Sequence, residues 1–213
     1  TFSRKAADEL KLRINSQTTS NDKSMFIGTF HALALRILKS IGNDTGFGQE
    51  LKIWSKDYER LSVIEDIQKK ENIEEYFETL ESEDAKPAAV LAYIDSVREE
   101  LLDPEDASIR ASEKGDKAEL AYCEVYREYD QYLEEQDKLD FPRMVQMAVK
   151  ALKHNAANGG SYLRKFKHVL VDEFQDINAA QKCMIGYFVS ANSHLWAVGD
   201  DYQAIYGWRG SNV

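Results

Sequence analysis

The feature that most constrains the fold is a short apolar run at 167–171 that leads directly into an acidic cluster at 172–176. The run has the length and composition of a strand that is buried on both faces of a parallel sheet. Asn178 is placed to cap a helix that follows, and a second apolar run at 194–198 ends at another acidic cluster, 199–201. Strand, helix and strand with acidic residues at both strand ends predict an open α/β sheet, whose ligands bind at the carboxyl edge.

Charge divides the chain into three segments. Residues 1–48 hold 7 basic and 4 acidic side chains, residues 49–140 hold 12 and 28, and residues 141–213 hold 8 and 5. The overall net charge of -10 argues against a protein that coats nucleic acid by bulk electrostatics. An acidic middle between two mildly basic flanks favours an inserted module, although uneven charge on a single domain explains the count equally well.

Apolar residues in the acidic middle recur at helical spacing. Pro87 and Pro104 each stand where the first turn of a helix would begin, and acidic residues fill the outward positions. We therefore expect an inserted all-helical subdomain at 49–140, with its tyrosines in the core rather than stacked on bases. The apolar stripes comprise Leu61, Ile64, Ile67, Ile73, Tyr76, Phe77, Leu80, Val90, Leu91, Ile94, Val97, Leu101, Tyr122, Val125, Tyr126, Tyr129, Tyr132 and Leu133.

The two flanks instead alternate between helix and strand. Residues 4–14 show an amphipathic helical pattern, 25–27 form a short apolar run suited to a strand, and Thr29 is placed to cap a helix that ends at Gly42. Asp140 is placed to cap the first helix after the insert. We expect both flanks to contribute to one α/β domain, in which 25–27 and 168–171 share a parallel sheet.

The acidic cluster after the first strand is the candidate catalytic centre. Asp172 would sit at the mouth of the sheet, where a carboxylate can hold Mg²⁺ through water. Glu173, the next residue, can take a proton from a water that attacks a phosphate. The alternative is a strand-end turn whose acids are simply solvated, since an acidic chain contains several acid pairs by chance.

The loop after the second strand combines an amide, two aromatic rings and an arginine. Gln203 could touch a terminal phosphate or the attacking water. Tyr206 and Trp208 are spaced to stack on unpaired bases, and Arg209 can pair with a backbone phosphate. Aromatic side chains in a loop are also common as core plugs, so this segment alone does not decide between binding and packing.

Several classes of protein are disfavoured by the sequence. No apolar run reaches the roughly 20 residues that a bilayer span needs, and the start does not read as a signal peptide. Cys123 and Cys183 lie far apart and lack metal-ligand spacing, so we expect neither a disulfide framework nor a zinc site. These features indicate a reducing, cytoplasmic location.

Five segments resemble, in family order, the motifs of superfamily 1 DNA helicases of the UvrD, PcrA and Rep type. Residues 171–181, VDEFQDINAAQ, resemble the magnesium-binding motif II, and 198–210 look like motif III. Residues 1–7, TFSRKAA, are similar to motif Ia, and 28–31, GTFH, to a DNA-contacting segment. Residues 139–141 resemble the point where the family's chain returns from subdomain 1B.

The resemblance implies a fold and a set of roles. Residues 1–48 and 141–213 would form RecA-like subdomain 1A, a parallel sheet flanked by helices, and 49–140 would form subdomain 1B. Asp172 would hold Mg²⁺ through water, Glu173 would be the catalytic base, and Gln203 would couple the γ-phosphate to the DNA site. The residues that would face single-stranded DNA are Phe30, His31, Tyr206, Trp208 and Arg209.

The same resemblance implies ATP and Mg²⁺ as cofactors, movement from 3′ to 5′ on single strands, and unwinding of duplex at single/double-strand junctions. No Gly-x-x-x-x-Gly-Lys-Ser/Thr phosphate loop occurs in these 213 residues. We therefore expect a fragment of a larger enzyme that binds DNA weakly and does not turn over ATP alone. Two alternatives stay open: the motor of a helicase-nuclease, and a noncatalytic protein-interaction module with a helicase-like fold.

Overall fold

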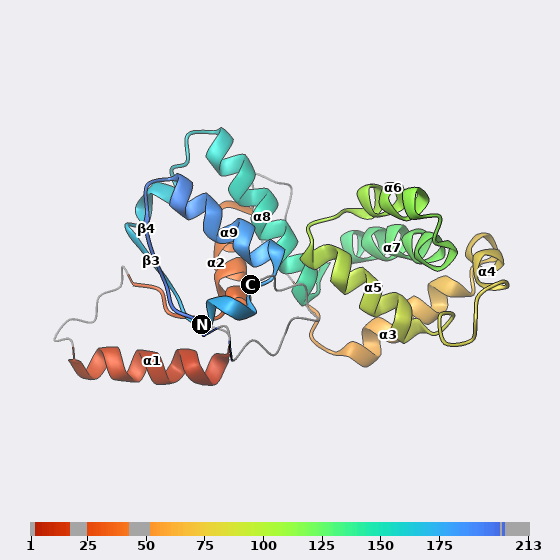
Figure 1. Cartoon of the computed structure of the whole chain (residues 1–213), viewed down its shortest axis with the longest axis horizontal. Helices are drawn as coiled ribbons and strands as arrows, with labels where there is room; N and C mark the ends of the chain where they lie inside the picture. Colours follow the sequence, from red (N-terminus) through yellow and green to blue (C-terminus); the bar gives the residue numbers. More distant parts are fainter. Residues whose placement is uncertain (1–2, 18–24, 43–51, 201, 203–213) are drawn as a thin grey trace. The chain divides into compact units, whose positions relative to one another are not determined.

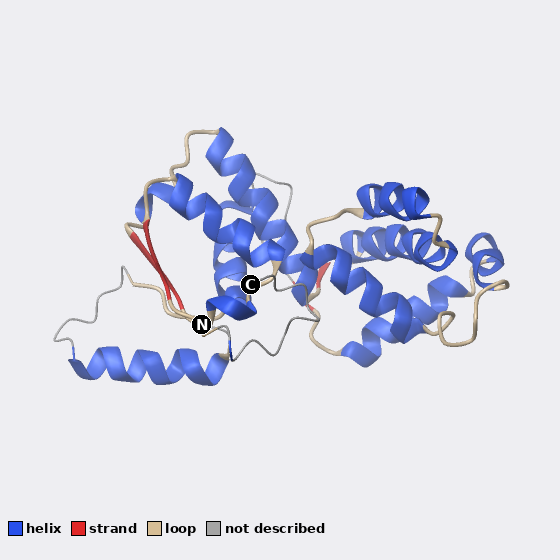
Figure 2. Cartoon of the chain, in the orientation of Figure 1, coloured by secondary structure: helices blue, strands red, loops and turns tan. Residues whose placement is uncertain are grey.

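The computed structural model describes residues 3–17, 25–42, 52–200 and 202. The chain divides into two compact units, which we call the α/β unit (Thr1–Gln49 with Met144–Val213) and the helical unit (Glu50–Arg143) (Figure 1). The sequence placed the corresponding boundaries nearby, after residues 48 and 140. Secondary structure is a mixture of many helices with two small parallel sheets (Figure 2). None of the helices in the described ranges is long and apolar enough to span a bilayer.

The helical unit contains five helices between two very short strands. Pro87 and Pro104 occupy the first turns of their helices, as predicted, where their missing N–H groups have no helical partner to lose. Asp103 and Asp116 cap the two helices that follow them in sequence, and Gly115 ends the first of these in a left-handed conformation. The elements are β1 (Lys52–Ile53), α3 (Asp57–Gln68), α4 (Glu71–Phe77), α5 (Pro87–Glu99), α6 (Pro104–Lys114), α7 (Lys117–Glu135) and β2 (Lys138–Leu139).

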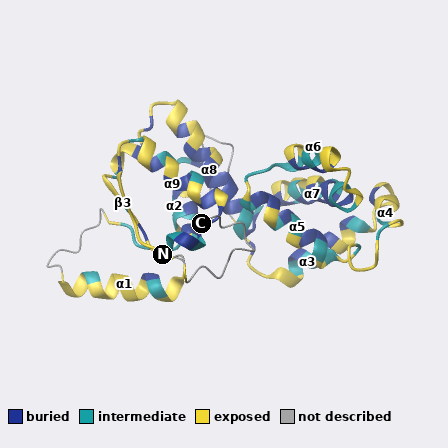
Figure 3. Ribbon diagram, viewed as in Figure 1, coloured by how far each residue is buried: buried dark blue, intermediate teal, exposed yellow. Residues whose placement is uncertain are grey.

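The core of the helical unit is formed by the apolar stripes that the sequence indicated. Tyr126 and Tyr129 of α7 are fully buried, and Trp54 stacks on Tyr129 with ring centroids 6.5 Å apart. Figure 3 shows the buried faces of α3, α5 and α7 together with the exposed outer faces of the same helices. The prediction that these tyrosines are core residues is therefore confirmed for Tyr122, Tyr126 and Tyr129, whereas Tyr132 is partly buried and Tyr76 is exposed.

The expectation of an all-helical middle segment is wrong in one respect. β1 pairs with β2 in a parallel ladder that aligns Lys52 with Lys138 and Ile53 with Leu139. A strand of two residues is too short to show a hydrophobic periodicity. The two strands also lie five helices apart in the sequence, and only the folded helices bring them together. The ladder joins the two ends of the helical unit.

A buried ion network lies inside the helical unit around Asp140. Arg98 is fully buried and contacts the Asp140 carboxylate oxygens at 2.9 and 3.1 Å, and it contacts Asp130 Oδ1 at 2.7 Å. The Tyr129 hydroxyl donates to Asp140 Oδ2 at 2.9 Å, and the Arg143 backbone N–H donates to Oδ1 at 2.9 Å. The last bond is the helix cap that the sequence predicted for Asp140.

The charges of this network determine how its carboxylates titrate. Burial alone would raise the pKa of Asp140, but the neighbouring Arg98 and Arg60 guanidinium groups and two hydrogen bonds outweigh it and lower the pKa of Asp140 below its ordinary value. Arg60 also pairs with Asp95 in a bidentate contact. The Asp140 carboxylate is therefore ionised and held within the core.

The α/β unit places helices beside a two-stranded sheet (Figure 1). Thr29 Oγ1 accepts from Ala32 N at 3.2 Å and Asn178 Oδ1 accepts from Gln181 N at 2.9 Å, so both predicted caps are confirmed. The first helix is longer than the predicted 4–14 and extends to Gln17. The elements are α1 (Arg4–Gln17), α2 (Phe30–Ile41), α8 (Phe141–Ala157), η2 (Leu163–Lys165), β3 (His168–Val171), η3 (Phe174–Asp176), α9 (Ala179–Ser190) and β4 (His194–Ala197).

β3 and β4 are parallel, as predicted, with His168 aligned to His194 and Val171 to Ala197. Their burial differs from the prediction of strands covered on both faces. Leu170 is 75% exposed and Trp196 is 64% exposed, and every residue of β4 is exposed. Within the described residues these two strands pair only with each other, so neither outer edge of the sheet is paired with a third strand.

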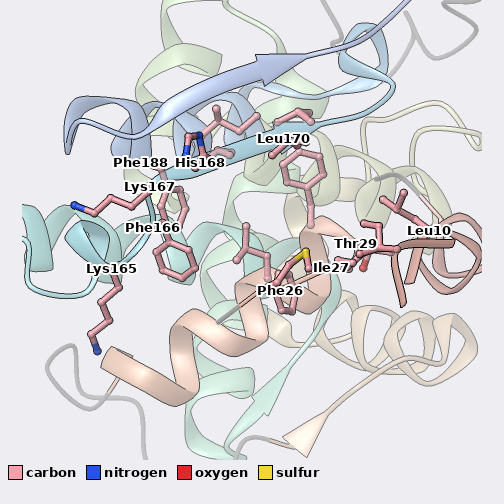
Figure 4. A pocket seen from close by; sticks show the side chains of 18 residues that line it. Leu10, Phe26, Ile27, Thr29, Lys165, Phe166, Lys167, His168, Leu170 and Phe188 are labelled. Carbon is pink, nitrogen blue, oxygen red and sulfur yellow. The ribbon is translucent and has the colours of Figure 1, made fainter. Parts of the chain in front are cut away.

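The predicted strand at 25–27 does not form. These residues carry no strand assignment, and the prediction that they share a sheet with β3 is therefore not met in the structure. They line one side of a cavity of about 430 Å³ whose other side is β3 (Figure 4). A strand exists only through hydrogen bonds to a neighbour, and here the cavity separates the segment from the nearest strand.

Candidate functional site

The candidate site is the carboxyl edge of the β3–β4 sheet. Because the strands are parallel and in register, the loops that follow Val171 and Ala197 emerge at the same edge. Two backbone hydrogen bonds continue the pairing beyond the strands: Val198 N donates to Val171 O at 2.9 Å, and Phe174 N donates to Val198 O at 3.0 Å. The two acidic clusters predicted from the sequence are thus brought together as far as Asp200.

Asp172 and Glu173 follow β3 directly. Asp172 is exposed and Glu173 is partly buried. Glu173 has a left-handed backbone conformation, with φ 55° and ψ 48°, before the single turn of η3. This conformation is uncommon for residues other than glycine and often marks a functional position. The Asp176 N–H donates to Glu173 O at 3.0 Å and closes the turn.

The neutral amide of Gln175 connects the two loops. Gln175 Nε2 donates to Glu173 Oε2 at 2.8 Å, and Gln175 Oε1 accepts from Asp200 N at 3.0 Å. Gln175 is 6% exposed, so these bonds satisfy a buried polar group. The amide therefore links the proposed base to the backbone of the loop after β4.

Asp176 adds a third carboxyl group to the same turn. Burial, followed by the nearby Glu173 carboxylate, raises the pKa of Asp176. Its Oδ1 atom is buried and finds no hydrogen-bond partner among the residues that the structure describes. The strand-end turn therefore concentrates negative charge where a cation would offset it.

The donor set fits magnesium but is not a complete cage for the ion. Carboxylate oxygens are hard ligands, and Mg²⁺ is commonly held by one or two of them together with water and substrate phosphates. In the described ranges no group of three or more His, Cys, Asp or Glu side chains is arranged to hold a metal ion. The carboxylates present could thus supply part of a magnesium coordination shell, which would need water or other ligands to complete it.

The predicted DNA-facing residues are only partly described. Phe30 is the first residue of α2 and is 8% exposed, so the part of it that could reach a base is small. His31 is partly buried at the same end of the helix. Gln203, Tyr206, Trp208 and Arg209 lie outside the described residues. Their assigned roles remain predictions.

The cavity beside β3 is distinct in character from the strand-end site. Its lining is largely apolar, with Phe26, Ile27 and Leu170 among the contributors, and Figure 4 shows the amino groups of Lys165 and Lys167 directed away from these side chains. It offers few of the polar groups that a nucleotide phosphate requires. We therefore do not assign it to nucleotide binding.

Sequence reasoning missed the roles of Gln175 and Gly199 at this edge. An ideal Cβ on Gly199 would lie 2.6 Å from Gln175 Oε1 and 3.2 Å from the backbone nitrogens of Phe174 and Gln175. A side chain at 199 would therefore displace the Gln175 amide and crowd both backbone nitrogens, so glycine favours the close approach of the two loops. The signal in the sequence was a neutral amide inside an acidic cluster, but its partners were not deducible without the strand pairing.

Known proteins resemble this chain along its whole length. The family described as UvrD/REP helicase N-terminal domain matches residues 1–213. An ATP-dependent DNA helicase PcrA of Bacillus subtilis is 32% identical over all of this chain and 27% of its own length. A probable DNA helicase II homolog of Mycoplasma capricolum is 32% identical, and a PcrA of Staphylococcus epidermidis is 30% identical, each over all of this chain and 28% of its own length.

These relatives identify the family of proteins in which the strand-end carboxylates occur. The chain spans little more than a quarter of the length of the helicases it matches. The match nevertheless covers every residue of the chain, from the segment before α1 to the loop after β4. The chain therefore belongs to the UvrD/REP helicase family, whose N-terminal domain it matches.

Proposed function

We propose that this chain is part of an ATP-dependent DNA helicase that moves 3′ to 5′ on single-stranded DNA and unwinds duplex. The observation that carries the proposal is the pair of carboxylates, Asp172 and Glu173, at the shared carboxyl edge of β3 and β4 in a chain of this family. The strand-end position, rather than the acidic residues themselves, separates this pair from the many other acids of the chain.

The two carboxylates have different tasks in this proposal. Asp172, the exposed one, would hold Mg²⁺ through water, and the ion would offset charge on the β- and γ-phosphates of bound ATP. Glu173 would accept the proton of the water that attacks the γ-phosphate. Glu173 is partly buried, and the hydrogen bond that its carboxylate accepts from Gln175 would restrict the movement of the carboxylate.

The proposal also assigns the two units of the chain to subdomains of the helicase fold. The α/β unit corresponds to RecA-like subdomain 1A, and the helical unit corresponds to the inserted subdomain 1B. These 213 residues contain no phosphate loop of the Gly-Lys-Ser/Thr type. We therefore expect no turnover from this chain alone and weak binding to single strands, which an acidic helical unit disfavours. The full-length protein would act in the cytoplasm.

An unwinding assay with the full-length protein tests the direction of movement. Two labelled duplexes of equal length, one with a 3′ single-stranded tail and one with a 5′ tail, are incubated with Mg-ATP. We expect strand separation of the 3′-tailed duplex only, with the labelled strand intact. Preference for the 5′ tail would contradict the proposal. Shortened products would favour a helicase-nuclease, and the absence of both ATP hydrolysis and unwinding would favour a noncatalytic module.

The residues that follow β4 in the sequence supply a separate test of DNA binding. In the full-length protein, Trp208→Ala should weaken single-strand binding by about 1 to 3 kcal/mol, the usual contribution of one base–aromatic stack, with little change in salt dependence. Arg209→Ala should instead reduce the salt slope by about one unit, because one phosphate contact is removed. Salt titrations of oligonucleotide binding measure both effects. Normal DNA binding with a lower melting temperature in Trp208→Ala would identify Trp208 as a core residue.

A further inference from the structure

Gln175 is a buried amide between two loops that belong to different strands. It lies in η3 after β3, is 6% exposed, and contacts the backbone of Asp200 after β4. A buried amide left without partners is costly, so its position is defined by the groups that it bonds. Those groups are a carboxylate on one side and a backbone N–H on the other.

The partners fix the orientation of the amide. Gln175 Nε2 is 2.8 Å from Glu173 Oε2, and Gln175 Oε1 is 3.0 Å from Asp200 N. An ionised carboxylate only accepts hydrogen bonds and a backbone N–H only donates, so a flipped amide would lose both bonds. A glutamate at 175 could accept from Asp200 N but could not donate to Glu173.

The surrounding backbone holds the amide in this place. Phe174 N donates to Val198 O at 3.0 Å, which joins the two loops next to Gln175. Gly199 allows the approach, since a Cβ there would lie 2.6 Å from Gln175 Oε1. Phe174, Val198 and Gly199 thus all contribute to the contact between the two loops.

We propose that Gln175 is a positioning residue that fixes the Glu173 carboxylate relative to the loop after β4. The inference deepens the proposed function and rests on it, because it gives Glu173 the role of base. Asp200 lies three residues before Gln203 in the sequence. Gln175 therefore ties the base to the segment that is expected to sense phosphate and DNA.

The size of the effect follows from what positioning contributes to catalysis. A displacement of about 1 Å in a reacting group can cost about 100-fold in rate. Gln175→Met keeps the length of the side chain but removes both hydrogen bonds, so the carboxylate is free to rotate. In the full-length protein we expect kcat for ATP to fall about 10- to 100-fold, while the KM for ATP changes little.

A matched control separates this effect from the loss of any glutamine–glutamate bond. Gln131 is exposed on α7 and donates from Nε2 to Glu135 Oε1 at 2.8 Å, which is the same chemistry away from the site. Gln131→Met should leave kcat unchanged. Equilibrium binding of Mg-ATP and the melting temperature, measured for both variants, show whether the protein remains folded and able to bind.

Gln175→Glu isolates the bond to the base. This variant keeps an acceptor for Asp200 N but places a second carboxylate against Glu173. We expect its kcat to fall at least as far as that of Gln175→Met. Normal kcat in Gln175→Glu together with low kcat in Gln175→Met would overturn the proposal, because the contact with Asp200 alone would then matter.

Combining Gln175→Met with Glu173→Gln tests whether Gln175 acts through Glu173. If it does, the double variant has nearly the kcat of Glu173→Gln alone, because the base is already absent. Independent, multiplying losses would overturn the positioning role. Normal kcat in Gln175→Met with a deep loss in Glu173→Gln would overturn this inference only, whereas normal kcat in Glu173→Gln would overturn the proposed function itself.

Discussion

The helical unit and the α/β unit differ in which side chains they bury and which they expose. The helical unit encloses even its charges, since Arg98 and Asp140 are both fully buried and bond each other at 2.9 Å. The α/β unit leaves apolar strand residues exposed, among them Leu170 and Trp196. The first unit thus pairs charges that it buries, whereas the described sheet of the second unit leaves large apolar side chains exposed.

The difference indicates which unit depends on further polypeptide. Parallel sheets are normally covered on both faces, and two strands without such cover are rarely stable in water. The apolar cavity between 25–29 and β3 adds a second uncovered surface. We infer that polypeptide beyond the described residues covers this sheet in the full-length protein.

The largest effect should come from the buried charges of the helical unit. Asp140→Ala leaves the Arg98 guanidinium buried without its main partner, so we expect a loss of about 3 to 5 kcal/mol in the free energy of unfolding. Urea unfolding followed by Trp54 fluorescence, with Trp196 and Trp208 replaced by Phe, reports on this unit.

Truncating Lys70, whose ion pair with Glu128 is exposed on the lysine side, should cost at most about 1 kcal/mol.

A double replacement sharpens that result. Arg98→Met with Asp140→Leu removes both charges and keeps apolar volume, so it should be much less destabilising than Asp140→Ala. Equal losses in the single and double variants would mean that the unpaired Arg98 charge does not control stability at this position.

The second-largest effect is the difference in stability loss between truncating a leucine in the helical unit and truncating one in the α/β unit. Leu133 is fully buried on α7, so Leu133→Ala should cost about 2 to 5 kcal/mol. Leu170 is 75% exposed on β3, so Leu170→Ala should change the stability of this 213-residue chain by no more than about 0.5 kcal/mol. Thermal unfolding of both variants measures the contrast.

The full-length protein provides the control for the leucine comparison. If additional chain covers β3 there, Leu170→Ala should destabilise that protein clearly more than it destabilises the 213-residue chain. An equally small effect in both would contradict the inference that further polypeptide covers the sheet.

The smallest effect is the pH dependence of the helical unit. The folded-state pKa of Asp140 lies below its unfolded value of about 3.9, so this group stabilises the fold above that pH and loses its contribution as the pH falls through the folded pKa. The stability advantage of the wild type over Asp140→Asn should therefore shrink on acidification below about pH 4. Urea midpoints between neutral and acid pH test this. An advantage that is constant down to the acid limit would contradict the assignment.

Local chemistry made much of the fold predictable. Thr29, Asp140 and Asn178 were identified as helix caps because a short polar side chain before an apolar stripe has a specific task. The β3–helix–β4 order followed from two apolar runs and turn residues. The placement of Asp172 and Glu173 after a strand suggested phosphate chemistry, and the family resemblance implies the same role, which stays a prediction.

The features that sequence missed all depend on partners distant in the chain. The β1–β2 ladder joins segments that five helices separate. The predicted strand at 25–27 and the predicted burial of β3 both assumed neighbouring strands that the described residues do not include. The role of Gln175 depends on Asp200, a contact across two loops that exists only after β3 and β4 pair.

The central claim is that Glu173 is the base for ATP hydrolysis at the carboxyl edge of the sheet. In the full-length protein, Glu173→Gln should retain Mg-ATP binding and lower the single-turnover rate of ATP hydrolysis in the presence of single-stranded DNA by about 100-fold or more. Glu135→Gln, on the exposed end of α7, serves as the matched control and should hydrolyse ATP at the normal rate. Hydrolysis by Glu173→Gln at the rate of the unmodified protein would contradict the account and leave Glu173 as a structural residue of the strand-end turn.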